Sequence, residues 1–426
     1  MHTVNQIEFT LPCGLPCLVA ARPYGKSLGA ALMLPVGYRH DPARLQGLAH
    51  LSEHMAFRGD NRALAERLTN EGGNVSAWTA ASYTHFRVGG HEDQFATAIS
   101  LLANVIRGGP RQLKEFYAER EILFHEMSEH NMRGSSDEAY YGFWRSILGD
   151  PNWRTTYEKQ RRRVRRLSVD VIRQFIEWNY CPQYARLAVV APRPAADLRA
   201  ALIEIFSCFA TIKGPADVNV SLPDTEVRST SFVFGSFRHM WVRLALRSRR
   251  SDPVMRLAAR LVDHLLADGP HSALFRRLRT ERALAYSVVS NSWPDLDRTI
   301  VDTYIGISRK SLWPALDVLL NEVRKLAERG VGEEEFENFR RKSIRHHELS
   351  MDQPGALADF LAYEMLRPAA HRCTSTQAYV DFLSQVSRED VNRAIAELLA
   401  PANRYLFIAG PVGPLARFRI RRWLQK

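Results

Sequence analysis

The amino-acid sequence predicts an α+β protein with two similar domains, each a mostly antiparallel β-sheet with helices packed on it. Two observations support this fold class. Strand-like and helical segments come in runs rather than in strict alternation, and a pattern from the first half of the chain returns in the second half. The chain has 426 residues, 46% of them hydrophobic, which favours more than one domain.

The first half contains the clearest secondary-structure signals. Three segments rich in β-forming residues come first, two long helical patterns follow, and one apolar strand completes the half. These segments are residues 4–11, 15–23, 28–37, 94–109, 111–130 and 185–192. Because strands and helices are grouped, the order favours α+β layers over a doubly wound parallel sheet.

The repeat links residues 41–60 with residues 252–270. The aligned pairs are His54 with His264, Glu53 with Asp263 and His50 with Arg260, at an offset of 264 − 54 = 210 residues. An internal duplication would explain this similarity. Since arginine replaces a metal-capable histidine in the second copy, only the first copy is expected to hold a metal.

A polar segment separates the two halves. It contains Gly214 and Pro215 and is typical of a linker. We therefore expect an N-terminal domain over residues 1–212, a linker over 213–228 and a C-terminal domain over 229–426.

The net charge of +12 is partly concentrated in the run Lys159–Arg166. Basic patches attract phosphates, so a nucleic-acid surface is the alternative interpretation of this run. No helix-turn-helix, zinc finger or aromatic-interleaved motif accompanies the run. We interpret it as a solvated helix face and expect no nucleic-acid partner.

The sequence also predicts the membrane association, the cellular location and the cysteine pairing of the protein. The longest apolar run, residues 28–37, is too short to span a membrane, so no membrane partner is expected. Residues 1–23 lack the order of a secretory signal and the Arg- and Ser-rich character of a transit peptide, which favours a cytoplasmic protein. The five cysteines are scattered, and neither a disulfide framework nor a zinc knuckle is indicated.

The segment Gly47–Asp60 contains the pattern H-x-x-E-H, formed by His50, Glu53 and His54. On a helix, residues four apart project from one face, and Glu53 lies on the same side. Catalytic zinc commonly keeps two histidines, one carboxylate and an open position for water. A nearby carboxylate that does not ligate can accept the proton of that water. The pattern therefore supplies two ligands and a base, and a third ligand is needed.

The best candidates for the third ligand lie in residues 118–130. Glu119 and Glu126 are seven residues apart, so they share a helix face after two turns. One of them could ligate while the other supports a ligating histidine. His125 and His130 are alternatives by residue type, although His125 points away from that face.

These motifs resemble the pitrilysin/insulysin family of inverted zincins, whose signature is H-x-x-E-H. The resemblance is strongest to the short members related to mitochondrial processing peptidase. Five segments agree in order along nearly the whole chain: residues 11–23, 47–60, 70–88, 119–127 and 274–288.

The resemblance implies a role for each matching residue. The implied zinc ligands, one zinc per chain, are His50, His54 and Glu126, with Glu53 as general base and Glu119 as the supporting carboxylate. From the second domain, Arg279 would bind substrate carbonyls and Tyr286 would donate to the scissile carbonyl oxygen.

Substrate would pair with an edge strand that contains Ser76 and Ala77. The family usually has Asn where Ser76 stands, so we expect main-chain pairing to persist without an Asn side-chain contact. The segment before Arg161–Arg166 also lacks the family's usual Gly-containing loop.

The resemblance thus implies a zinc metalloendopeptidase for short or unfolded peptides. Members of this length pair two chains, so we expect a homodimer or a heterodimer with a related, degenerate subunit. The alternative is a noncatalytic assembly subunit of the same fold, but such chains typically lose ligands that this chain retains.

Overall fold

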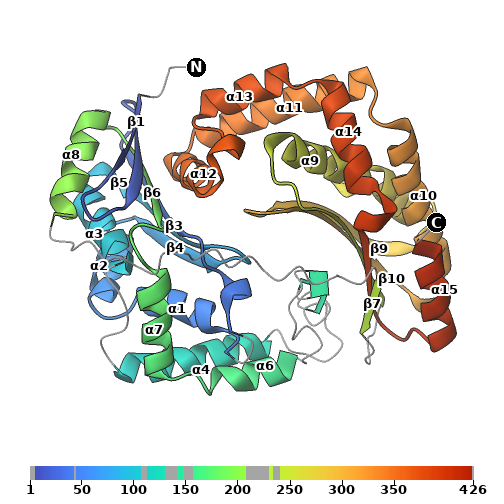
Figure 1. The fold of residues 1–426 in the computed structure, drawn as a ribbon, viewed down its shortest axis with the longest axis horizontal. Helices are drawn as coiled ribbons and strands as arrows, with labels where there is room; N and C mark the ends of the chain where they lie inside the picture. Colours follow the sequence, from blue (N-terminus) through green and yellow to red (C-terminus); the bar gives the residue numbers. More distant parts are fainter. Residues whose placement is uncertain are drawn as a thin grey trace. The chain divides into compact units, whose positions relative to one another are not determined.

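The computed structural model describes residues 5–42, 45–106, 113–129, 142–144, 146–147, 157–207, 230–233 and 240–424 (Figure 1). The chain divides into two compact units. Unit 1 consists of residues 1–126, 159–221 and 344–381, and unit 2 consists of residues 127–158, 222–343 and 382–426. The boundaries between the units fall between residues 221 and 222 and within four helices, which are α4 (Leu113–Glu129), α6 (Tyr157–Val164), α11 (Glu333–Met351) and α13 (Thr376–Gln385).

Unit 1 contains a six-stranded sheet with the strand order β1-β2-β6-β3-β5-β4. Neighbouring strands are antiparallel, except that β2 and β6 are parallel. The strands are β1 (Gln6–Thr10), β2 (Pro16–Ala21), β3 (Ser27–Leu34), β4 (Asn74–Thr79), β5 (Thr84–His91) and β6 (Arg186–Ala191). The helices are α1 (Leu48–Ala56), α2 (Asp60–Asn70), α3 (Phe95–Ile106), α4 (Leu113–Glu129), α6 (Tyr157–Val164), α7 (Val169–Asn179), α8 (Ala195–Ile205) and α12 (Pro354–Leu366).

Unit 2 contains a five-stranded sheet with the strand order β7-β11-β8-β10-β9. Here β7 and β11 are the parallel pair, and the other neighbours are antiparallel. The strands are β7 (Thr230–Val233), β8 (Met240–Ser248), β9 (Ala285–Pro294), β10 (Thr299–Ile307) and β11 (Arg404–Ala409). The helices include α9 (Pro253–Ala267), the π-helix Phe275–Thr280, α10 (Leu312–Arg329), α14 (Arg388–Leu399) and α15 (Pro414–Leu424).

The two sheets confirm the predicted α+β class with two similar domains. Each sheet has its single parallel pair at the corresponding position, and α1 follows β3 as α9 follows β8. The predicted strands at residues 4–11, 15–23, 28–37 and 185–192 correspond to β1, β2, β3 and β6. Seven of the eight β3 residues are buried, which explains why a continuous apolar run forms a central strand.

The units differ from the domain boundaries expected from the sequence, residues 1–212 and 229–426. Residues 344–381 belong to unit 1 because α12 covers one face of its sheet, while α3 and α8 lie on the opposite face (Figure 1). Leu357 and Leu361 of α12 pack against Met33 of β3 in one buried cluster. Burying each leucine is worth about 1.5–3 kcal/mol, so this packing outweighs proximity along the chain.

Unit 2, in turn, contains a segment from the first half of the chain. Phe143, from the first half of the chain, lies 6.1 Å from Tyr405 and 6.0 Å from Phe407 of β11, measured between ring centroids. Residues 127–158 accordingly belong to unit 2. The expected linker, residues 213–228, lies outside the described residues.

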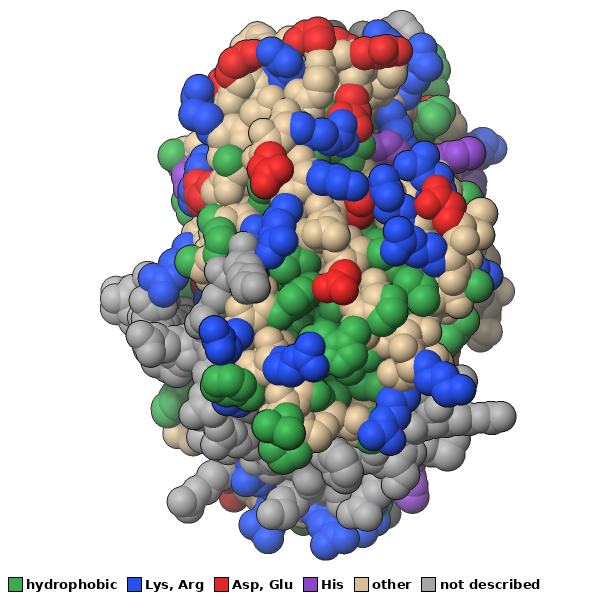
Figure 2. Space-filling model, turned by 90° about the vertical axis from the view of Figure 1, so that its right-hand side faces the viewer, with side chains coloured by type: hydrophobic (Ala, Val, Ile, Leu, Met, Phe, Trp, Pro, Cys, Tyr) green, Lys and Arg blue, Asp and Glu red, His purple; other side chains and the backbone are tan. Residues whose placement is uncertain are grey.

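The apolar character of the helices and the distribution of charged side chains are the features that could indicate a membrane or nucleic-acid partner. Among the residues that the structure describes, no helix is long and apolar enough to cross a membrane. On the face drawn in Figure 2, Lys and Arg side chains are spread among acidic and hydrophobic ones rather than gathered in one stretch. The described cationic side chains on this face are therefore dispersed.

Candidate metal centre

The helix that carries the H-x-x-E-H pattern is fixed at its N-terminus by a distant carboxylate. Asp41 accepts hydrogen bonds from the backbone N–H groups of Gly47 (2.7 Å) and Ala49 (2.8 Å), which satisfies donors that a helix start leaves free. Gly47 has φ +90°, a left-handed conformation that favours glycine. A Cβ at Gly47 would also lie 3.0 Å from a methyl of Val164. Helix α1 thus starts at Leu48, two residues before His50.

His50 and His54 direct their Nε2 atoms at each other. The two atoms are 3.3 Å apart, and the rings meet at 82° with centroids 4.8 Å apart. Tetrahedral zinc, with bonds of about 2.0–2.2 Å, requires ligand atoms to lie roughly 3.3–3.5 Å from one another. The histidine pair meets this requirement without rearrangement.

Glu126 of α4 completes a group of three. One carboxylate oxygen lies 3.5 Å from His54 Nε2, and the other lies 3.9 Å from His50 Nε2. Within the described ranges this is the only group of three or more His, Cys, Asp or Glu whose ligand atoms lie within 4.8 Å of one another. The Glu126 side chain is 42% exposed, so solvent can reach the group. These three residues fit a metal with one open position.

His125 and His130, the alternative ligands, have different positions. His125 is exposed and meets the ring of Phe124 at its edge. His130 lies outside the described residues. The structure thus brings Glu126, not His125, to the histidine pair, and the ligand roles stay a prediction.

Glu119 lies behind the cluster, buried on α4. Its carboxylate is 3.1 Å from His54 Nδ1 and forms an ion pair with Arg58. This contact favours the tautomer that carries hydrogen on Nδ1 and leaves Nε2 free to ligate. Burial would raise the pKa of Glu119, but the hydrogen bonds from His54 and Arg58 outweigh it and hold the pKa below its ordinary value.

The two histidines have opposite pKa shifts. Burial, and then the neighbouring His54, lower the pKa of His50 to about 3, so His50 is neutral and able to ligate. Burial also acts to lower the pKa of His54. The hydrogen bond to Glu119 and the charges of Glu53 and Glu126 prevail, and the pKa of His54 is raised.

Glu53 lies on α1 beside the cluster and is buried. The hydroxyl of Thr79, the last residue of β4, donates a hydrogen bond of 2.6 Å to its carboxylate. Burial raises the pKa of Glu53, although Thr79 and His54 act against this rise. A carboxylate with a raised pKa suits a general base. Thr79 lies within residues 70–88, one of the segments that carry the family resemblance, and its contact with Glu53 was not predicted from the sequence.

Ser76 and Ala77 lie on β4, the edge strand of the unit 1 sheet. In register, Ser76 pairs with Arg87 and Ala77 with Phe86 of β5. No described strand pairs with the other edge of β4. The Ser76 hydroxyl oxygen is enclosed and has no hydrogen-bond partner among the described residues. This edge can therefore accept an added strand.

Arg279 and Tyr286 lie in unit 2. Arg279 belongs to the π-helix, and its guanidinium lies 5.2 Å from the Phe275 ring centroid. Tyr286, on β9, packs edge-on against Trp241 at 5.6 Å and is 45% exposed. A Cβ at Gly306 would lie 2.5 Å from the Tyr286 ring, so the ring needs glycine there. Their role toward the cluster of unit 1 stays a prediction.

Some side chains of the arginine run, Lys159–Arg166, make packing contacts, and others are exposed. The guanidinium groups of Arg161 and Arg165 lie 4.1 and 3.6 Å from the ring centroid of Phe124, and Arg165 pairs with Glu121 at 2.7 Å. The Arg165 side chain is still 50% exposed, so the predicted solvated face also packs against α4 through cation–π contacts. This packing supports the helix that carries Glu119 and Glu126.

Comparison with known proteins identifies the family of this chain. A family model described as "Insulinase (Peptidase family M16)" matches residues 17–138, and one described as "Peptidase M16 inactive domain" matches residues 166–343. The chain belongs to the M16 peptidase family. The resemblance to pitrilysin and insulysin is thereby confirmed, and the second match covers the half in which Arg260 replaces a metal-capable histidine.

Several relatives of this chain are named as zinc proteases. An "Uncharacterized zinc protease" of Streptomyces coelicolor is 24% identical over 95% of this chain and 89% of its own length. A protease from Helicobacter pylori has a similar fold, with a TM-score of 0.82 at 16% identity, covering 96% of this chain and all of that chain. Pitrilysin gives a TM-score of 0.71 at 19% identity over 97% of this chain, which spans 45% of pitrilysin.

Proposed function

We propose that this chain is a zinc metalloendopeptidase in which His50, His54 and Glu126 hold one zinc ion. The observation that carries the proposal is the convergence of three ligand atoms within 4.8 Å, next to the buried carboxylate of Glu53. When bound at such a site, zinc polarises a carbonyl and lowers the pKa of water.

The surrounding residues hold and move protons at defined atoms. Glu53 acts as general base, and Thr79 holds one of its oxygens so that the other can accept a proton. Glu119 keeps the proton of His54 on Nδ1 and so keeps Nε2 available to the metal.

Substrate recognition relies on the backbone. An extended peptide adds to the free edge of β4 at Ser76 and Ala77, where main-chain hydrogen bonds supply affinity with little sequence preference. Folded proteins cannot offer such a strand and are excluded. Arg279 binds substrate carbonyls, and Tyr286 donates to the carbonyl oxygen as its charge grows.

Assembly and location complete the proposal. The enzyme works as a homodimer or with a related, degenerate subunit, and its expected compartment is the cytoplasm. The noncatalytic alternative is disfavoured, because this chain retains the complete donor set and Glu53.

A chelation experiment tests the proposal. The purified protein is incubated with unfolded peptides, and products are identified by mass spectrometry before chelation, after chelation and after zinc is restored. We expect cleavage to be lost and then regained. Equal cleavage by the chelated protein would contradict a metallopeptidase.

A further inference from the structure

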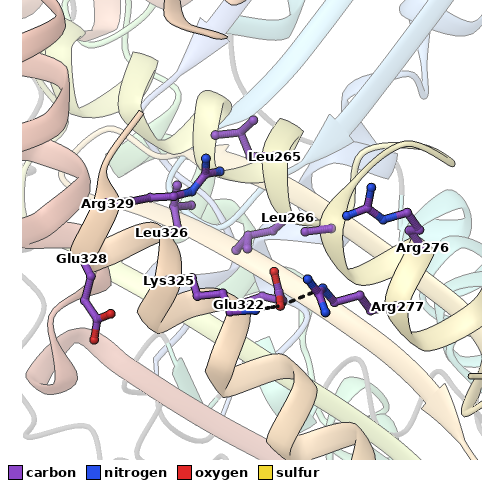
Figure 3. A pocket seen from close by; sticks show the side chains of 10 residues that line it. Leu265, Leu266, Arg276, Arg277, Glu322, Lys325, Leu326, Glu328 and Arg329 are labelled. Carbon is purple, nitrogen blue, oxygen red and sulfur yellow. Dashed lines mark hydrogen bonds and ion pairs between the residues drawn. The ribbon is translucent and has the colours of Figure 1, made fainter. Parts of the chain in front are cut away.

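A cleft of about 420 Å³ lies in unit 2 between α9, α10 and the π-helix Phe275–Thr280 (Figure 3). Small-molecule sites typically have volumes of about 300–1,000 Å³. The side chains that line this cleft are Leu265, Leu266, Ala273, Arg276, Arg277, Glu322, Lys325, Leu326, Glu328 and Arg329. All belong to unit 2, whereas the metal cluster belongs to unit 1.

Positive charge exceeds negative charge in this cleft. Four lining side chains are cationic and two are acidic, a balance of 4 − 2 = +2. One oxygen of Glu322 lies 2.9 Å from Arg277 Nε and 3.1 Å from Lys325 Nζ. A single, nearly buried carboxylate therefore serves two cations and leaves most of their N–H donors for other partners.

The remaining two cations flank the apolar part. Figure 3 shows the guanidinium groups of Arg276 and Arg329 on opposite sides of Leu266. Within the part of the chain that the structure describes, Arg276 pairs with Glu281 at 3.3 Å and Arg329 pairs with Glu335 at 3.5 Å. Both arginines are more than half exposed, and exposed pairs of this kind contribute little, so a ligand can compete for these groups.

We propose that this cleft binds an organic anion with an apolar body. Its carboxylate or phosphate head accepts hydrogen bonds from the cations, since charge-assisted bonds of this kind are strong. Its apolar body covers Leu265 and Ala273, which are the partly exposed apolar residues of the lining, and the alkyl stems of the cations, which removes apolar surface from water. A small inorganic anion lacks the apolar body, and a neutral lipid lacks the charged head group.

Occupancy of the cleft also acts on the π-helix. Arg276 and Arg277 are its second and third residues, and Arg279 is its fifth. Leu278, between Arg277 and Arg279, is fully buried and anchors the helix in the core. π-Helices are rare and frequently occur at functional sites. A ligand that orders this helix fixes the backbone of Arg279, and this regulatory part rests on the proposed substrate contact of Arg279.

Calorimetric titration of the zinc-loaded protein with decanoate tests the binding site. We expect saturable binding of one decanoate per chain, with no binding of acetate or decanol at the same concentrations. Decyl phosphate, tested in parallel, distinguishes the two head groups.

Matched variants locate the site. Lys325→Gln and Arg329→Gln should each raise the dissociation constant about tenfold. Lys310→Gln, which removes an exposed cation of unit 2 outside the cleft, should leave it unchanged. Equal affinity in the double variant Lys325→Gln/Arg329→Gln, with its circular dichroism unaltered, would overturn the proposal, as would absence of binding to the native chain.

Peptide cleavage tests the regulatory part. Decanoate should raise kcat/KM about fivefold or more in the native chain. It should have no effect in the double variant, whose basal kcat/KM we expect to equal that of the native chain. Binding without any change in kcat/KM would contradict regulation. Because calorimetry needs no turnover, a chain that binds decanoate and cleaves nothing would refute the peptidase proposal and not the site.

Discussion

Glu53 and Thr79 are joined by a hydrogen bond of 2.6 Å that connects the helix of the metal cluster with the edge strand. Glu53 is the proposed base, and Thr79 ends the strand on which substrate is proposed to bind. One contact therefore aligns the proton acceptor with the position of the peptide.

Replacement of Thr79 tests this alignment. Thr79→Val keeps the shape of the side chain and removes the donor, so kcat should fall about tenfold while zinc content is unchanged. Thr79→Ser retains a hydroxyl and should keep most of the activity. If Thr79→Val were fully active in steady-state peptide cleavage, the hydrogen bond would have no catalytic role.

Glu119 is expected to control metal affinity through His54. Glu119→Gln removes the charge behind the imidazole, and zinc affinity should fall about 10–100-fold in a chelator competition assay. Glu121→Gln, on the same helix but paired with Arg165 at 2.7 Å, is the matched control and should bind zinc normally. Unchanged affinity in Glu119→Gln would remove this residue from the site.

Arg279 and Tyr286 are expected to act on substrate and not on the metal. Arg279→Ala and Tyr286→Phe should retain zinc and lose roughly 10²-fold or more in kcat/KM, because each removes a contact that strengthens as charge develops. Native turnover by both variants would leave the second unit with a structural role.

Asp252 stabilises the start of α9 in unit 2. Its carboxylate accepts from the Met255 backbone N–H at 3.2 Å and pairs with Arg250 at 2.8 Å. Burial would raise the pKa of Asp252, but these contacts lower it below the ordinary value. Because the folded pKa is lower than the unfolded one, the stabilisation is present at neutral pH and is lost as pH falls through the acid range.

Asp252→Ala should therefore lower the free energy of unfolding of the domain by about 1–2 kcal/mol at pH 7. The difference from the native chain should shrink as pH falls below about 4, as measured by urea unfolding. A difference that is independent of pH would show that the carboxylate charge is not involved.

Local periodicity made much of the site predictable. His50, Glu53 and His54 lie within one helix, and Glu119 and Glu126 lie two turns apart on another, so sequence spacing alone places each set on one face. The apolar runs of β2, β3 and β6 were equally clear, because central strands are buried on both faces.

Tertiary packing explains what periodicity missed. Thr79 reaches Glu53 across 26 positions, and that contact depends on how β4 packs near α1. The assignment of α12 to the first sheet depends on a buried face that chain order does not reveal. Charge alone indicated a solvated arginine run, whereas its contact with Phe124 requires knowing that α6 lies against α4.

The most direct measurement is zinc content combined with peptide cleavage in the native chain, Glu53→Gln and Glu126→Gln. Mass spectrometry should find about one zinc per native chain and per Glu53→Gln chain, and much less in Glu126→Gln. Cleavage should fall by about 10²-fold or more in Glu53→Gln although its metal is retained. Full zinc and full activity in Glu126→Gln, or full activity in Glu53→Gln, would contradict the proposed centre.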